Sequence, residues 1–132
     1  SGGKYIAPQV LENTFKQSRF IEQIMVIGDG EKMPAAFIQP NFEFVREWAH
    51  RHHDLNVGAT NEELCTNKMV IDRIQEEIDH CNEKFGNWEK VKRFELTPEV
   101  WSIDAGHLTP TMKLRRKIIK ERYSDLYQKI YG

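Results

Sequence analysis

The sequence of 132 residues contains few cysteines and no long apolar run. Cys65 and Cys81 are too few and too far apart for a disulfide framework or for a Cys-x-x-Cys metal site. Sparse thiols fit a reducing compartment, so we expect a cytoplasmic protein. No apolar run approaches the roughly 20 residues that a membrane-spanning helix needs, and no signal peptide is visible. We therefore expect an ordinary globular domain.

An excess of charge of one sign is also lacking. Nineteen lysines and arginines face 20 aspartates and glutamates, and the formal net charge is -1. The chain as a whole thus lacks the basic surface that marks nucleic-acid binders and anionic-membrane binders. We expect no nucleic acid among its partners, and any recognition of an anion has to be local.

The length suits one domain that spans residues 1–132 and buries a core without disulfides or metals. The chain opens with Ser1, Gly2 and Gly3 and has no initiator methionine. We expect it to be a piece of a longer protein.

Apolar periodicity and turn residues divide the chain into irregularly alternating helices and strands. We expect helices over 8–18 and 41–53, a short helix capped at Thr60, a longer helix over 70–85 closed by Gly86, and a helix after Pro110. Strands are expected at 5–6, 21–27, 35–39, 91–97 and 100–103, and those at 21–27 and 35–39 should form a hairpin. The fold class is therefore α+β, with a small mixed or antiparallel sheet flanked by helices.

Residues 108–117 carry an unusual charge pattern. Pro110 should end the preceding element, and four cations follow where a helix should begin: Lys113, Arg115, Arg116 and Lys117. A helix N-terminus is itself partly positive, so cations there need another reason. An anion-binding site formed by Lys113 and free backbone amides is one interpretation, and a solvated basic face is the other. The residues alone leave both open.

The rest of the C-terminal segment has a clear apolar periodicity. Its residues at three- and four-residue spacing predict one buried helix face: Leu114, Ile118, Tyr123, Leu126, Tyr127 and Ile130. Since Arg115 and Arg116 fall off this face, we favour surface or interdomain contacts for them over a catalytic role.

Two other groups of reactive side chains have simpler explanations. His50, His52 and His53 gather at the end of a predicted helix, where either a metal or the helix dipole would favour them. Their spacing matches no standard helical metal pair, which favours the dipole. Cys81 lies on an apolar helix face and is interpreted as a small buried hydrophobe, not a nucleophile. We assign no metal ligand.

Two stretches at opposite ends of the chain resemble the C-terminal subdomain of adenylate-forming acyl-CoA synthetases, most closely the long-chain fatty-acyl-CoA ligase branch. Residues 1–12 are similar to the family's glycine hairpin, which leads through Ile-x-Pro into a helix that ends in Glu. Residues 108–117 are similar to its C-terminal lysine motif, although many members have Ser-Gly-Lys where this chain has Thr-Met-Lys. Residues 98–102 also resemble the segment before that motif in the long-chain branch.

The resemblance implies a ligase that works in two steps. A fatty acid carboxylate attacks the α-phosphate of ATP, and the thiol of coenzyme A then displaces AMP from the acyl-adenylate. Lys113 would be the adenylation lysine, whereas Gly2, Gly3 and Lys4 would line the coenzyme A passage after a domain rotation. ATP and Mg²⁺ would be bound mainly by a large N-terminal domain that is absent from this chain, so the fragment alone should be inactive. Peripheral association of the parent enzyme with the inner face of the membrane stays open.

Two alternatives stay open. A free-standing interaction module would use its basic helix to bind an acidic partner or nucleic acid, with an affinity for nucleic acid that falls steeply with salt. A related ligase would use a carrier-protein thiol in place of coenzyme A. At the level of single residues, the glycine hairpin could be only a tight turn, and Lys4 could contact coenzyme A phosphates or only water.

Overall fold

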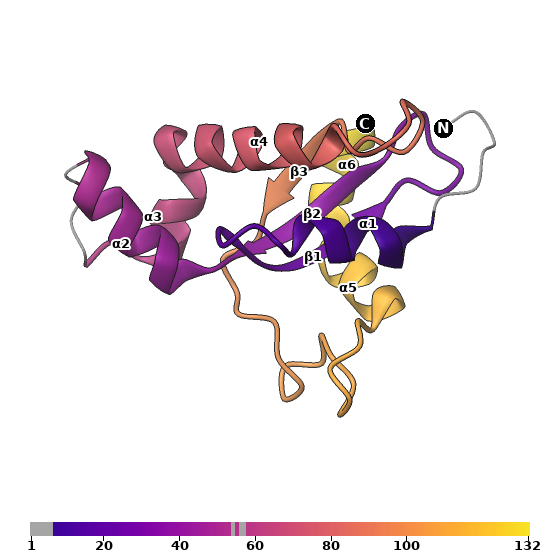
Figure 1. Cartoon of the computed structure of the whole chain (residues 1–132). Helices are drawn as coiled ribbons and strands as arrows, with labels where there is room; N and C mark the ends of the chain where they lie inside the picture. Colours follow the sequence, from indigo (N-terminus) through magenta and orange to yellow (C-terminus); the bar gives the residue numbers. More distant parts are fainter. Residues whose placement is uncertain (1–6, 54, 56–57) are drawn as a thin grey trace.

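The computed structural model describes residues 7–53, 55 and 58–132 (Figure 1). The predicted strand at 5–6 and the predicted ligand-binding residues Gly2, Gly3 and Lys4 lie outside the described residues. No helix in the described part is long and apolar enough to cross a membrane. The helices and strands formed by the described residues are α1 (Pro8–Phe15), β1 (Ile21–Ile27), β2 (Ala35–Pro40), α2 (Phe42–His53), α3 (Asn61–Thr66), α4 (Lys68–Asn82), β3 (Arg93–Leu96), α5 (Arg116–Arg122) and α6 (Ser124–Tyr131).

The three strands form one mixed sheet in the order β1-β2-β3. β1 and β2 pair antiparallel across a hairpin, with Ile24 opposite Ile38. β3 pairs with β2 in parallel, with Phe94 opposite Ala36. A parallel pair needs a long crossover, which α2, α3 and α4 supply. The predicted α+β class is confirmed.

Both faces of β1 and β2 are covered, which explains why these strands are almost continuously apolar. One face contributes Ile24, Val26, Ala36 and Ile38 to a core shared with α1, α2 and α4. The other face contributes Met25, Ile27, Ala35 and Phe37 to a second core, which also contains Trp101, Ile119, Tyr123 and Ile130. The C-terminal helices therefore cover the sheet face opposite α1 and α4.

The predicted helix starts at Pro8, Asn41 and Thr60 are confirmed, but two predicted helix ends are wrong, since α1 ends at Phe15 and not near Ser18. The Asn41 side chain accepts a hydrogen bond from the Phe44 amide, and Thr60 forms a full capping box with Glu63. α4 ends at Asn82, so Gly86 does not close it. The reason is tertiary, since the Asn82 amide group exchanges two hydrogen bonds of 2.9 and 3.0 Å with the Val91 backbone.

The predicted strand at 100–103 is also wrong, because its backbone groups bond to side chains. The Trp101 amide donates to Gln39 Oε1 at 3.0 Å, and the Ser102 amide donates to His107 Nδ1 at 3.2 Å. Val100 and Ile103 remain exposed. Residues 97–115 consequently form a long loop, drawn in orange in Figure 1, which leads from β3 to α5.

The C-terminal segment contains two short helices instead of the single predicted helix. Tyr123 interrupts it between α5 and α6, with φ -103° and ψ 31°. Ile119 is fully buried, whereas the predicted Ile118 is only half-buried. The other members of the predicted face do pack toward the second core, where Tyr123 and Ile130 are buried and Leu114, Leu126 and Tyr127 are partly buried.

Candidate functional site

Lys113 lies on an exposed loop of residues 108–114, which we call the lysine loop. The backbone of this loop is closely hydrogen-bonded. Leu108 and Leu114 pair as an antiparallel bridge at the base of this loop. Nearer the tip, the Thr109 amide donates to the Lys113 carbonyl at 2.8 Å, and the Lys113 amide donates to Thr109 Oγ1 at 3.0 Å. The Lys113 ammonium group makes no hydrogen bond or ion pair with any described residue. The loop thus fixes the backbone of Lys113 and leaves its charge free.

Met112 adopts a left-handed backbone conformation directly before the lysine. Its φ is 67°, in the region that glycine enters without steric cost, and it is the sole described non-glycine residue with positive φ. This geometry explains why the Gly of a Ser-Gly-Lys sequence suits the same position. The methionine is tolerated here because its side chain is 58% exposed and displaces nothing.

The predicted position of Lys113 at the N-terminus of a helix is wrong. α5 begins at Arg116, three residues after Lys113, and has no side-chain cap. The intervening residues are held by the Leu108–Leu114 bridge and by a 2.8 Å bond from the Arg115 amide to the His107 carbonyl. Free amides of the helix therefore do not converge with the Lys113 ammonium group.

A different set of groups lies beside Lys113. A pocket of about 290 Å³ separates its loop from α1, and beyond Lys113 its polar lining consists of Gln9, Asn13, Lys16 and Gln23, together with Glu12 and Arg116, which neutralise each other. Amide groups and ammonium groups both donate hydrogen bonds, and the two lysines add positive charge. The pocket therefore suits an anionic group such as a phosphate or a carboxylate.

Arg116 forms a bidentate ion pair with Glu12, and its side chain stays 34% exposed. Its two terminal nitrogens donate to the Glu12 carboxylate at 2.8 and 2.6 Å, and the same carboxylate accepts the Val26 amide at 2.8 Å. Glu12 is only 5% exposed. The hydrogen bonds to Glu12 raise the pKa of Arg116 above its ordinary value. The pair joins α1 to α5, across 104 residues of sequence.

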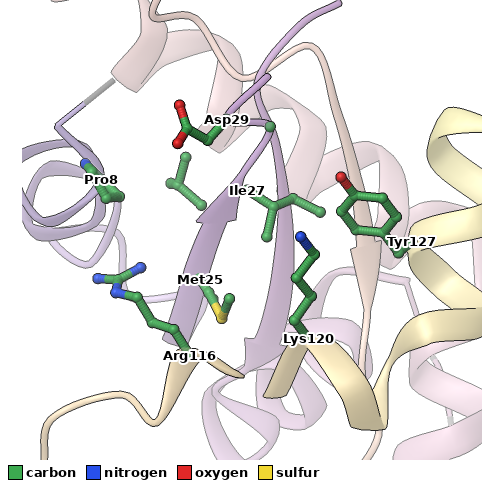
Figure 2. A pocket seen from close by; sticks show the side chains of 9 residues that line it. Pro8, Met25, Ile27, Asp29, Arg116, Lys120 and Tyr127 are labelled. Carbon is green, nitrogen blue, oxygen red and sulfur yellow. The ribbon is translucent and has the colours of Figure 1, made fainter. Parts of the chain in front are cut away.

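A second pocket, of about 340 Å³, lies between the start of α1, the end of β1 and the C-terminal helices (Figure 2). Figure 2 shows Met25 and Ile27 on its floor, with Asp29 at one end. Arg116 and Lys120 extend from α5 along its side, and Lys120 lies over the Tyr127 ring at 4.8 Å. Since Arg116 is paired with Glu12 and Lys120 contacts an aromatic face, this pocket has less free positive charge than the one beside Lys113.

The histidines and cysteines give no sign of metal or nucleophile chemistry. His50, His52 and His53 occupy the last turn of α2, where His50 contacts the Leu55 carbonyl and His53 packs on Trp48. Within the ranges that the structure describes, no group of three His, Cys, Asp or Glu side chains could hold a metal ion. The described residues therefore do not fit a Mg²⁺ site.

We expect both thiols to react slowly with a thiol reagent such as DTNB at about pH 8 while the chain is folded. Burial, together with the charges of Glu62 and Glu99, raises the pKa of Cys65 to about 12. Burial also raises the pKa of Cys81. Absorbance at the thionitrobenzoate maximum measures the rate, and denaturant should release both thiols. Rapid stoichiometric reaction of the native protein would contradict this prediction.

Solved structures define the class of protein to which this fold belongs. The A-PCP didomain of carboxylic acid reductase from Segniliparus rugosus, solved in complex with AMP, matches 99% of this chain and 16% of its own, with a TM-score of 0.76 and 19% identity. A fatty acyl CoA synthetase from Mycobacterium tuberculosis matches 96% of this chain and 19% of its own, with a TM-score of 0.57 and 16% identity. The fold is that of the C-terminal subdomain of adenylate-forming enzymes.

The chain belongs to the AMP-binding enzyme C-terminal domain family, whose model matches residues 1–132. It is 31% identical to the long-chain-fatty-acid CoA ligase FadD15 of Mycobacterium tuberculosis, over 100% of this chain and 22% of the relative. It is 35% identical to long-chain-fatty-acid CoA ligase 1 of Homo sapiens, over 98% of this chain and 19% of the relative. The chain thus spans about a fifth of the length of these curated relatives.

Proposed function

We propose that this chain is the C-terminal domain of an AMP-forming long-chain fatty acid CoA ligase, in which Lys113 assists formation of the acyl-adenylate. The similarity to long-chain ligases over the full length of the chain supports the reaction class. The observation that carries the role of Lys113 is a free ammonium group on a backbone that is fixed by hydrogen bonds. Such a cation has no hydrogen-bond or ion-pair partner among the described residues and is available to a substrate bound elsewhere.

The chemistry of adenylation needs a positive charge of this kind. The fatty acid carboxylate forms a bond to the α-phosphorus of ATP, and the bond to the bridging oxygen breaks as pyrophosphate leaves. Negative charge spreads over the phosphate oxygens in this step, and a preorganised donor stabilises it by roughly 2 to 4 kcal/mol. The Lys113 ammonium would donate to the carboxylate and phosphate oxygens while the pocket beside it accommodates anionic groups of the substrate.

The second step would use other parts of the enzyme. The thiol of coenzyme A attacks the acyl carbonyl, and AMP leaves with the electrons of the broken bond. Gly2, Gly3 and Lys4 are proposed to line the coenzyme A passage after the domain rotates, although they lie outside the described residues. ATP and Mg²⁺ would be held mainly by an N-terminal domain, which would be the principal partner of this one.

We also propose that the parent enzyme works in the cytoplasm, at the inner face of the membrane. The free thiols of Cys65 and Cys81 support a reducing compartment. The alternative of an interaction module with a basic helix has less support, because α5 is only seven residues long and Arg116 is paired with Glu12.

We expect Lys113→Ala, in the enzyme that contains this chain, to slow fatty-acid-dependent pyrophosphate release by about 10²-fold. Thioester formation from a presynthesised acyl-adenylate should keep most of its rate, since that step does not form the anhydride bond. Lys117→Ala, which removes a neighbouring exposed cation, is the matched control and should change either rate by no more than about twofold. Pyrophosphate release at nearly the normal rate in Lys113→Ala would refute the role of Lys113.

The thioester assay with presynthesised acyl-adenylate also tests which thiol accepts the acyl group. Thioester formation should proceed with coenzyme A and not with a carrier protein that bears the same pantetheine thiol. Preferential transfer to the carrier protein would instead support a ligase that uses a carrier-protein thiol in place of coenzyme A.

A further inference from the structure

Three aromatic side chains form a stack beneath the lysine loop. The His107 ring lies parallel to Trp101, with centroids 5.7 Å apart and an interplanar angle of 5°. Tyr123 packs against both rings, at 6.3 Å from His107 and 6.2 Å from Trp101. His107 is only 1% exposed, although it belongs to the long loop between β3 and α5. A buried histidine in a loop requires specific partners for its ring nitrogens.

The backbone hydrogen bond from Ser102 favours one tautomer of His107, in which the Arg122 guanidinium, a donor only, lies 3.2 Å from Nε2 without forming a hydrogen bond to it. The Ser102 amide donates to Nδ1 at 3.2 Å, so Nδ1 has no proton. The proton of the neutral ring is then on Nε2, which lies 3.3 Å from the Tyr123 hydroxyl. Tyr123 in turn donates to Glu99 Oε1 at 2.8 Å. A directed chain of hydrogen bonds therefore runs from Ser102 through His107 and Tyr123 to Glu99.

A second proton on the ring would disrupt this chain. Protonated Nδ1 cannot accept the Ser102 amide, which would lose a partner in a part-buried site. Arg122 of α5 also lies 3.2 Å from Nε2 and repels an imidazolium ion, whereas Glu99 attracts one. Glu99 accepts a hydrogen bond from the Tyr123 hydroxyl, and its effect on the His107 ring is smaller than that of Arg122. Among the charged and titratable groups that face His107, the arginine contact and burial therefore dominate.

His107 also forms the base of the lysine loop through its backbone. Its amide donates to the Ser102 carbonyl at 3.0 Å, and its carbonyl accepts the Arg115 amide at 2.8 Å. The next residue, Leu108, forms the bridge to Leu114. Lys113 has no buried contact of its own, so its position relative to the sheet depends on this base. The stack attaches the base to the start of α6 through Tyr123.

We propose that neutral His107 is a positioning residue for Lys113, holding the base of the lysine loop in the geometry that adenylation needs. This inference rests on the proposed function. Misplacing a catalytic group by about 1 Å can cost as much as about 10²-fold in rate. His107 itself does not contact the substrate and acts through the loop.

The direction of the pH dependence follows from the environment of the ring. Burial and the Arg122 charge lower the pKa of His107 below its ordinary value of about 6.5. A histidine whose pKa is lower in the folded state contributes stability that is fully present above about pH 6.5. That contribution is lost as the pH falls through the lower folded value. The loop should therefore loosen on the acid side of neutrality.

The test compares two substitutions at this position in the enzyme that contains the chain, with Lys113→Ala as reference. His107→Phe keeps an aromatic ring in the stack but removes both hydrogen bonds of the ring. It should slow pyrophosphate release by at least about tenfold. His107→Gln can accept from Ser102 and donate to Tyr123, but it does not titrate. It should restore much of the rate, and the fall on the acid side of the wild-type pH profile should disappear.

Amide hydrogen exchange provides a readout that does not depend on activity. The amides of Thr109, Lys113 and Arg115 should exchange at least about tenfold faster in His107→Phe than in wild type, while those of β1 and β2 stay unchanged. If amide exchange in the loop and the rate of pyrophosphate release are both normal in His107→Phe, the inference is overturned and the role of Lys113 stays intact. Normal pyrophosphate release in Lys113→Ala would overturn both proposals.

Discussion

Substitution of Arg116 by methionine is expected to lower the free energy of unfolding by about 3 to 5 kcal/mol, because it leaves a buried carboxylate without its cation. Methionine keeps most of the apolar stem of arginine, so the loss reports mainly the ion pair. Among the described residues, Glu12 would retain the Val26 amide alone as a partner, in a site where it is 5% exposed. Urea unfolding of this chain, followed by circular dichroism, measures the change.

A matched control separates the buried pair from a surface pair of the same type. Lys129 bonds to Glu95 at 2.9 Å, but the lysine side chain is 63% exposed. Lys129→Met should cost less than about 1 kcal/mol. The double substitution Glu12→Leu with Arg116→Met should recover stability relative to Arg116→Met, since no uncompensated charge remains. If Arg116→Met costs no more than Lys129→Met, the pair is not a structural anchor.

Gly28→Ala is expected to destabilise the chain by about 3 kcal/mol, through the sum of backbone strain and overpacking. Gly28 has a φ of 124°, and a Cβ there would lie 2.6 Å from the Met33 carbonyl oxygen and 2.9 Å from Pro34 Cα. Both atoms belong to the backbone of the same hairpin and cannot move away without distorting β2. The Tyr131 hydroxyl, which donates to the Met33 carbonyl, would lie at 2.8 Å from the new carbon. The chain therefore has no space for a side chain at this position.

Gly30 is the matched control in the same turn. Its φ is 77°, but no atom lies within 4 Å of a Cβ at that position. Gly30→Ala should therefore cost only the backbone strain, about 1 to 2 kcal/mol. Thermal unfolding of the two variants compares them directly, and equal losses would show that crowding at Gly28 contributes nothing.

Most of the helices and the three strands of the described sheet could be predicted from the sequence because their signals are local. The apolar runs at 21–27 and 35–39 and the caps at Asn41 and Thr60 depend only on neighbouring residues. The failures have long-range causes. Residues 100–103 have strand-like composition, yet Gln39 binds the Trp101 amide from a distant strand. In the same way, Tyr123 interrupts the C-terminal helix where its hydroxyl bonds to Glu99.

The candidate site could be predicted only in part for the same reason. Lys113 was identified by its motif, and its role stays a prediction. The predicted placement of Lys113 at a helix N-terminus was wrong because the sequence contains no local sign of the bridge between Leu108 and Leu114. The partnership of Glu12 with Arg116 spans 104 residues, so no periodicity could reveal it. The sole available signal was that both residues lie within the two motifs. Nothing near His107 in the sequence indicates its burial.

The covering of the second sheet face by α5 and α6 has a consequence for how the chain folds. Until the C-terminal segment is in place, the face that carries Met25, Ile27 and Phe37 lacks Ile119, Tyr123 and Ile130, which cover it in the second core. The parallel pairing of β2 with β3 likewise waits for residues far along the chain. Contacts of such long range slow the folding reaction, and apolar surface that stays open in the meantime promotes aggregation. A chain truncated before α5 should therefore fold slowly and self-associate, so the segment that presents the lysine is also the one that completes folding.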